Sequence, residues 1–201
     1  MPRNAKWRRP RTLRGGHAVN AFAEKLVIGR LTPAQFVQVL ETLHMLGSAG
    51  AGIELSSLST DVLVDVVRQA SRDQLKAIAD HPELRSVFLD EIFRRMSEHF
   101  SPHRAKHVDF VLSWRFSDGS GEDGYDRFQT VIEDGVCVSS TDLSRTPDTT
   151  ITLSVDDFIR MATGNAAVAA MFVTGRVKVK GEYAPAVRFS SYFDIPKPSG
   201  D

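Results

Sequence analysis

The sequence has a single cysteine and no long apolar run. Cys137 is alone among 201 residues, so no disulfide can form within the chain. Its place in a strand-like segment, with no histidine beside it, favours a packed thiol over a nucleophile. No apolar run approaches the roughly 20 residues that span a bilayer, and no apolar stretch of about 7–15 residues follows the basic N-terminus as in a secretory signal. We therefore expect a soluble, cytoplasmic protein.

Sequence motifs of common catalytic and metal sites are also absent. The chain has no nucleophile elbow, phosphate-binding loop or dinucleotide fingerprint. His99, His103 and His107 are spaced four apart. Pro102 interrupts the helix that would place their rings on one face for zinc. The sequence therefore predicts no catalytic residue, no cofactor and no metal site.

Acidic residues gather at two places without forming a recognised site. The segment "DGSGEDGYD" has the composition of a calcium loop, but Asp123 and Gln129 occupy the positions that an EF-hand gives to glycine and glutamate. We interpret this segment as a charged hairpin turn. Asp156 and Asp157 follow Ser154 at the start of a predicted helix, where acids favour the cap and the macrodipole.

Charge is balanced over the whole chain but not along it. The chain has 25 basic and 25 acidic residues, and six of the basic ones precede the first acid, Glu24. Residues 1–16, with prolines and glycines among like charges, predict a disordered basic tail. Such a tail could make weak contact with an anionic membrane, with Trp7 at the interface. No specific nucleic-acid binding is expected, because nothing downstream forms a basic surface with interleaved aromatics.

Helical signals dominate residues 17–83. Thr32 with Gln35, and Ser71 with Gln74, have the spacing of capping boxes. Ser59 is placed to cap a helix between them, and apolar residues recur at helical spacing after each start. We therefore predict a helical N-terminal extension. Its sequence leaves three roles open: it could cover a cavity, form a dimer surface or dock another protein.

The period changes near residue 108 to the alternation of half-buried strands. The segments "VDFVLSWRF", "YDRFQTVIEDG", "VCVSSTD" and "DTTITL" predict four strands in a meander. Asp134-Gly135 is the strongest hairpin signal in the chain.

A helix, a short apolar helix, a strand and a last helix follow. The first is predicted from Ser154 to Gly164, and the second, "AAVAAMFV", with Asn165 as its cap. Val177 and Val179 mark one face of a fifth strand, and residues 183–193 a final helix. The whole is an α+β arrangement.

Four segments of the C-terminal part occur in a recognisable order. They are "IFRRMSEHF", "DGSGEDGYDRFQTVIEDGVCV", "PDTTITLSVDDFIRMATG" and "AAMFVTGRVKVKGE". Their order and spacing resemble the sterol-carrier-protein-2 family from about Leu84 to Ile195. The last helix, "EYAPAVRFSSYF", differs from the family in having a proline and two serines where leucine and alanine are usual.

This resemblance implies a fold and a function. The family has a five-stranded mixed sheet backed by helices, with an apolar tunnel that accepts sterols, fatty acyl chains or similar lipids and no catalysis attached to the domain. The residues expected along such a tunnel are Trp114, Phe128, Phe158, Met161, Val168, Phe172, Val187, Phe189 and Phe193. The ending "PKPSGD" is not a peroxisomal address, so peroxisomal localisation is not implied.

These features predict four parts of the chain and three functions. The parts are the basic tail at 1–16, the helical extension at 17–83, the lipid-binding domain at 84–195 and a C-terminal tail at 196–201. The first function is non-catalytic binding or transfer of a hydrophobic ligand. The second is a structural or adaptor protein with a filled tunnel, in which residues 17–83 form a homo-oligomer or hold a protein partner. The third is a biosynthetic enzyme that uses the tunnel as a reaction chamber.

Overall fold

The chain folds into a sheet at one end and a stack of helices at the other. The computed structural model describes residues 20–23, 26–50, 54–117, 119, 121 and 123–196. The predicted basic tail at 1–16 lies outside these residues, as does the C-terminal tail after Pro196. The α-helices are α2 (Pro33–Ser48), α3 (Thr60–Gln69), α4 (Arg72–Asp80), α5 (Pro82–Glu98), α6 (Val155–Ala162), α7 (Val168–Val173) and α8 (Tyr183–Arg188). The 3-10 helices are η1 (Ile28–Arg30), η2 (Leu55–Ser57) and η3 (Phe189–Tyr192).

Five strands form one mixed sheet in the order β3-β2-β1-β4-β5. They are β1 (Phe110–Ser117), β2 (Tyr125–Glu133), β3 (Val136–Ser140), β4 (Thr149–Leu153) and β5 (Lys178–Gly181). The α+β class and the five-stranded mixed sheet are as predicted. The four-strand meander is wrong, because β4 crosses over to pair with β1 in parallel while the other neighbours are antiparallel.

Helices α2, α3 and α4 begin where the sequence predicts. Thr32 and Gln35 form a complete capping box, in which each backbone N–H bonds the other residue's side-chain oxygen at 2.9 and 3.2 Å. Ser71 and Gln74 do the same for α4 at 2.8 and 3.1 Å. Ser59 caps α3 through the Val62 N–H. These caps satisfy amide groups that helix ends otherwise leave unpaired.

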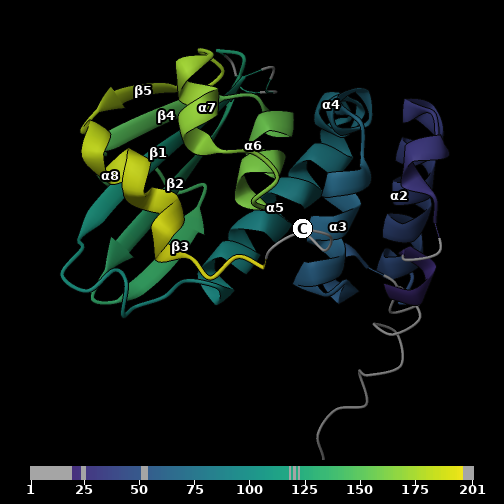
Figure 1. Cartoon of the computed structure of the whole chain (residues 1–201), viewed down its shortest axis with the longest axis horizontal. Helices are drawn as coiled ribbons and strands as arrows, with labels where there is room; N and C mark the ends of the chain where they lie inside the picture. Colours follow the sequence, from purple (N-terminus) through teal and green to yellow (C-terminus); the bar gives the residue numbers. More distant parts are fainter. Residues whose placement is uncertain are drawn as a thin grey trace, which may run out of the picture.

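One apolar core runs through both ends of the molecule. It extends from Ile28 and Phe36 in the helical part to Phe189 and Phe193 at the C-terminal side. Helices α5 and α6 lie between the sheet and α3 and α4, with α2 outermost (Figure 1). The division between the extension and the lipid-binding domain stays a prediction. Of the described residues, no helix combines the length and apolarity needed to cross a bilayer.

The region after α6 differs from its prediction. Gly164, with a φ of 70°, ends α6 as expected. Asn165 does not cap the next helix; its side-chain amide donates instead to the Val64 carbonyl at 3.1 Å and to Thr163. Helix α7 starts at Val168 without a side-chain cap, and of its residues only Met171 is buried. Most of the apolar residues of α7 therefore lie outside the core.

Candidate functional site

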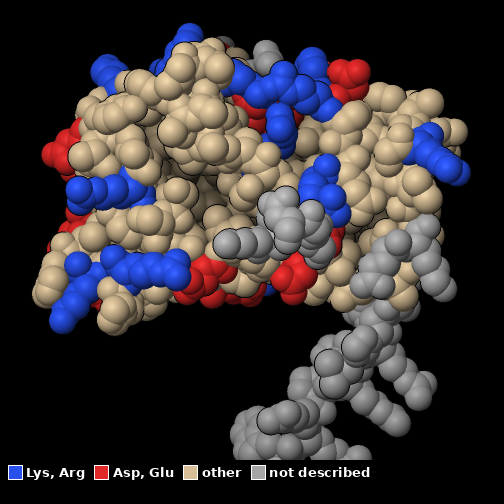
Figure 2. Space-filling view, viewed as in Figure 1, with Lys and Arg blue, Asp and Glu red and all other residues tan. Residues whose placement is uncertain are grey.

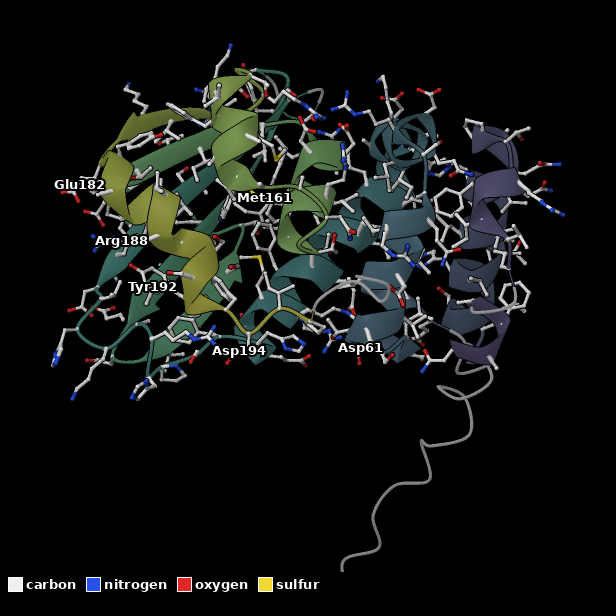
Figure 3. The ribbon with its side chains drawn as sticks, viewed as in Figure 1. Asp61, Met161, Glu182, Arg188, Tyr192 and Asp194 are labelled. Carbon is white, nitrogen blue, oxygen red and sulfur yellow. The ribbon has the colours of Figure 1, made fainter. Side chains whose placement is uncertain are left out.

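An apolar cavity lies between the sheet, α6 and the segment from α8 to η3. Trp114 of β1 and Ile151 of β4 form its wall on the sheet, and Met161 of α6 faces them. The lining residues are Met96, Trp114, Ile151, Met161, Ala162, Val168, Ala186, Phe189, Ser190, Phe193 and Ile195. Figure 3 labels Met161 on α6 and Tyr192 in η3, the two elements on either side. The cavity volume is about 30 Å³.

A second small cavity lies beside the first and has a more polar wall. It shares Met96, Ala162, Phe193 and Ile195 with the first cavity and also has a volume of about 30 Å³. Its other wall comes from α3 and α5 and carries three polar side chains, Thr60, Arg95 and His99. The two cavities therefore lie side by side in a mainly apolar region, and most of their polar side chains line the second cavity.

The polar wall is held by a buried arginine. Arg95 donates from Nε to Glu91 Oε1 at 2.6 Å and from Nη1 to Thr60 Oγ1 at 2.9 Å. Its Nη2 donates to the carbonyls of Leu58 and Leu55 at 2.6 and 3.1 Å. Because every nitrogen of this guanidinium has a partner in the protein, Arg95 supports the wall and does not offer a free anion site.

The carboxylate of Glu91 is stabilised by two arginines. Burial raises the pKa of Glu91, but hydrogen bonds and charge from Arg94 and Arg95 outweigh it, so its pKa lies below the ordinary value. His99 Nε2 lies 3.0 Å from Thr60 Oγ1, which extends this network to the edge of the second cavity. Among the described residues, no group of three or more His, Cys, Asp and Glu side chains is placed to hold a metal ion.

Comparison with known proteins places the sheet-bearing part in a family. The alkyl sulfatase C-terminal family matches residues 77–199. The chain belongs to this family. Its matched range starts within α4 and includes the whole sheet and the helices from α5 to α8.

Curated proteins with sequences similar to this chain are also found. Hydroxysteroid dehydrogenase-like protein 2 from Bos taurus is 29% identical over 107 residues, which cover 53% of this chain and 25% of that protein. The Homo sapiens protein of the same name is 28% identical over the same length. The chain thus spans about a quarter of the length of the curated relatives it matches.

Solved structures of two kinds are similar to this member of the alkyl sulfatase C-terminal family. A stereoselective inverting sec-alkylsulfatase from Pseudomonas sp. matches 93% of this chain and 33% of its own, with 15% identity and a TM-score of 0.48. Sterol Carrier Protein 2 Like 2 from Aedes aegypti matches 53% of this chain and 93% of its own, with 14% identity and a TM-score of 0.40. Sterol carrier proteins are thus among the similar structures, as the sequence resemblance predicted.

The structure brings five of the nine predicted tunnel residues to the first cavity. They are Trp114, Met161, Val168, Phe189 and Phe193. Phe158 lies behind the cavity in an aromatic cluster, with its ring centroid 5.1 Å from Trp114 and 4.9 Å from Phe116. Phe128 packs on Phe93, with ring centroids 4.8 Å apart, and lines two grooves beside α5 that include no other predicted tunnel residue.

Two predicted tunnel residues point away from the cavity. Phe172 is 38% exposed on α7, and Val187 is 47% exposed on α8. Sequence reasoning also missed lining residues, among them Met96, Ile151 and Ala186. The apolar pattern of the sequence could have identified Met96 and Ile151 as inward-facing, because each lies on the apolar face of its predicted helix or strand. The sequence has no such signal for Ala186, because a small residue on a short helix does not show which face of that helix is buried.

The segment that covers the cavity is fastened at its two ends. At the start, Thr149 Oγ1 donates to the Glu182 carbonyl at 2.5 Å. At the end, Ser101 donates its N–H to the Tyr192 carbonyl, and Asp194 donates to the His99 carbonyl, each at 2.8 Å. Between these points the segment contacts the body chiefly through side chains such as Ala186 and Phe189.

Cys137 is a buried thiol in β3, as predicted. It is 4% exposed, and burial raises the pKa of the thiol to about 12. Since the thiolate is the reactive form, we expect a maleimide at pH 8 to leave the native protein unlabelled and to label it fully in denaturant. Mass spectrometry of the two samples measures this. Rapid labelling of the native chain would contradict the buried position.

Proposed function

We propose that the chain binds a hydrophobic ligand with a single apolar chain in the cavity beside Trp114. The observation that carries this proposal is an apolar space between the sheet and a covering segment that is fastened at its ends. Burying about 100 Å² of apolar ligand surface contributes about 2.5 kcal/mol, so even a short alkyl chain gains useful affinity. The family is named for alkyl sulfatases, and an alkyl chain is the kind of group that suits this cavity.

Ligand entry requires the covering segment to move. Ligand pockets usually have volumes of about 300–1,000 Å³. In this proposal, the cavity of about 30 Å³ is the closed form of the site. In the proposed open form α8 and η3 move outward, and Phe189 and Phe193 exchange contacts with Trp114 and Phe100 for contacts with the ligand. The proposed role is carriage or presentation of the ligand, with no reaction assigned to this part of the chain. The cytoplasmic location stays a prediction.

A matched pair of alanines on α8 tests the binding proposal. Ala186 lines the cavity and is 4% exposed, whereas Ala184, two residues earlier, is exposed. Ala186→Leu places extra methyl groups in the cavity and is expected to weaken binding of a fluorescent fatty acid by about tenfold or more, equivalent to about 1.4 kcal/mol. Ala184→Leu is expected to bind as the unchanged protein does.

The readout is a fluorescence titration of delipidated protein, with native mass spectrometry for any copurified lipid. Denaturant unfolding of both variants shows whether Ala186→Leu still folds, since overpacking can cost about 1–3 kcal/mol. If the unchanged protein neither copurifies with lipid nor binds the fatty acid, the proposal is wrong.

The small cavity volume favours a second candidate, a structural protein that assembles through its helical part. Met45 and Leu46 on the outermost helix α2 are 63% and 42% exposed. Under this candidate, Met45→Glu with Leu46→Glu is expected to convert an oligomer to a monomer, because charges replace apolar contact area. Light scattering coupled to size-exclusion chromatography measures the mass. An unchanged protein that is already monomeric at high concentration argues against this candidate.

A further inference from the structure

The sheet face opposite the cavity carries a row of hydrogen-bond donors. Trp114 of β1 and Ile151 of β4 are paired in the sheet, and both line the cavity. Because successive side chains of a strand point to opposite faces, the next residues, Arg115 and Thr152, point to the other face. Thr152 is also paired with Lys178 of β5, so three side chains form one row across three strands. We call Lys178, Thr152 and Arg115 the outer-face row.

The outer-face row lies on the side of the sheet away from α8. Helix α8 contacts β4 and β5 (Figure 1), and its Ala186 lines the cavity together with Ile151. The surface over α7 and α8 is mostly uncharged, as Figure 2 shows. The basic side chains of β5 therefore belong to the opposite face of the sheet, and the helices that close the cavity do not cover them.

The donors of the outer-face row are little used within the described part of the chain. Lys178 has no ion pair with a described residue, and the Thr152 hydroxyl has no hydrogen bond to one. Arg115 stacks on the Tyr125 ring, and its Nη2 lies 3.8 Å from Asp123 Oδ2, which is too far for a hydrogen bond. Among the described residues, Arg115 Nε is a buried side-chain nitrogen without a partner. Because this side chain is 34% exposed, its guanidinium keeps donors that a ligand can reach.

Acids lie at both ends of this surface. Asp123 bonds Arg127, which is directly opposite Arg115 in the sheet. Asp148 precedes β4 and accepts a hydrogen bond from a backbone N–H of β1, and Glu182 follows β5. Both of these acids lie at the end of β5 that carries Lys180, away from Lys178. Positive charge without a bonded acid is therefore concentrated around Thr152.

Protection of a sheet edge explains only part of this arrangement. Lysines on an edge strand discourage pairing with another chain, and β5 is an edge strand of the sheet. This role accounts for Lys178 and Lys180, but Arg115 lies on the central strand. Arg115 is also directly opposite Arg127, although like charges across a strand pair destabilise a sheet. An anion bound over the row would offset that cost.

We propose that the outer-face row binds a tetrahedral oxyanion, the phosphate or sulfate group of a small soluble molecule. Neighbouring strands lie about 4.8 Å apart, so a group above Thr152 is within reach of the side chains on either side. An ammonium, a hydroxyl and a guanidinium all donate, and charge-assisted hydrogen bonds to an oxyanion are strong. This site lies across the sheet from the cavity, so it does not depend on the proposed function.

The surroundings of the row favour a small oxyanion over a larger anionic surface. The next row on this face consists of Lys180, Thr150 and Ser113, so no apolar side chain lies beside the donors to enter a bilayer. The Tyr125 ring already stacks on Arg115, which leaves no aromatic platform for the bases of a nucleic acid.

A titration with sodium phosphate tests the site in the full chain. Amide NMR shifts of the isotope-labelled protein are followed at constant ionic strength, with sodium chloride as the reference salt. Saturable shifts are expected around Thr152 and Lys178, with a dissociation constant of about 1 mM, and sodium sulfate is expected to shift the same amides. If neither anion gives a saturable change, or if chloride gives the same change, the proposal is wrong.

Two lysines of one strand provide a matched pair. Lys178→Gln and Thr152→Val are each expected to weaken phosphate binding by about tenfold. Lys180→Gln makes the same change in charge one row away and is expected to weaken binding by less than about threefold. Urea unfolding shows that each variant folds. Equal effects of the two lysine substitutions, with none from Thr152→Val, would mean that phosphate responds to general surface charge, which overturns the proposal.

Two further probes identify the source of the anion and its alternatives. Glycerol phosphate that binds as tightly as inorganic phosphate supports an esterified ligand, and binding of inorganic phosphate alone supports the free ion. Vesicles of phosphatidylcholine with about 30 mol% phosphatidylserine are the second probe. If Lys178 is needed for vesicle binding and phosphate has no effect, the row contacts a bilayer and the proposal is wrong. If the lysine variants aggregate faster and bind phosphate unchanged, the lysines only protect the sheet edge, which also contradicts the proposal.

Discussion

Replacing Arg95 with methionine is expected to destabilise the fold by about 3 kcal/mol. The side chain is buried and joins α5 to the start of α3, through Thr60 and the carbonyls of Leu55 and Leu58. Methionine has a similar length but no donors, so these acceptors lose their partners in a buried place. The cost is at the lower end of the range for a broken buried pair, because Arg94 still bonds Glu91. Urea unfolding at neutral pH measures the change.

Arg94 is the matched control for this prediction. It bonds the same carboxylate, but its side chain is 44% exposed and its other partner is Glu98 at the surface. Arg94→Met is expected to cost less than about 1 kcal/mol, as is usual for exposed pairs. Equal costs for the two variants would show that the contacts of Arg95 with α3 contribute little.

Replacing Phe158 with alanine is expected to cost about 4 kcal/mol of stability. Phe158 is fully buried, and its ring contacts the rings of Phe93, Trp114 and Phe116 at centroid distances of 4.9–5.1 Å. These aromatic side chains come from α5, α6 and β1, so no single element can close the space that the ring leaves. The midpoint of thermal or urea unfolding gives the loss.

Phe172 is a control of the same residue type at an exposed position. It is partly exposed on α7, and Phe172→Ala is expected to cost less than about 1 kcal/mol. Sequence reasoning assigned both phenylalanines to one tunnel, whereas the structure places them in the core and at the surface. A large loss at Phe172 would mean that its contact with Tyr183 holds α7 against α8 more firmly than their exposure indicates.

Local chemistry made much of the fold predictable. The capping boxes at Thr32 and Ser71 depend only on residues three apart, and both form as expected. Asp134 and Gly135 make the turn between β2 and β3 with positive φ angles, as an Asp-Gly pair predicts. The class of each long element follows from its apolar period, which needs no knowledge of the rest of the chain.

Elements whose place depends on distant partners were predicted less well. The position of β4 beside β1 depends on which strand edge is free after the hairpins form, and no local signal encodes it. Asn165 has the residue type of a helix cap, but its amide bonds the Val64 carbonyl, 101 residues away in sequence. The family resemblance predicted a tunnel between sheet and helices, and five of the nine residues named for it line the first cavity. Which face of α7 and α8 turns inward could not be read from six-residue helices, because so short a helix shows less than two periods.

The crossover that puts β4 beside β1 also sets the order in which the sheet can form. Strands β1, β2 and β3 are joined by consecutive antiparallel pairings, which close early in folding. The β1–β4 edge must wait for contacts such as that between Val111 and Asp148, which are 37 residues apart. Until then the central strand keeps an open edge, with unpaired amides that can pair with another chain. Slow folding at high concentration is thus the condition under which this protein is most exposed to aggregation.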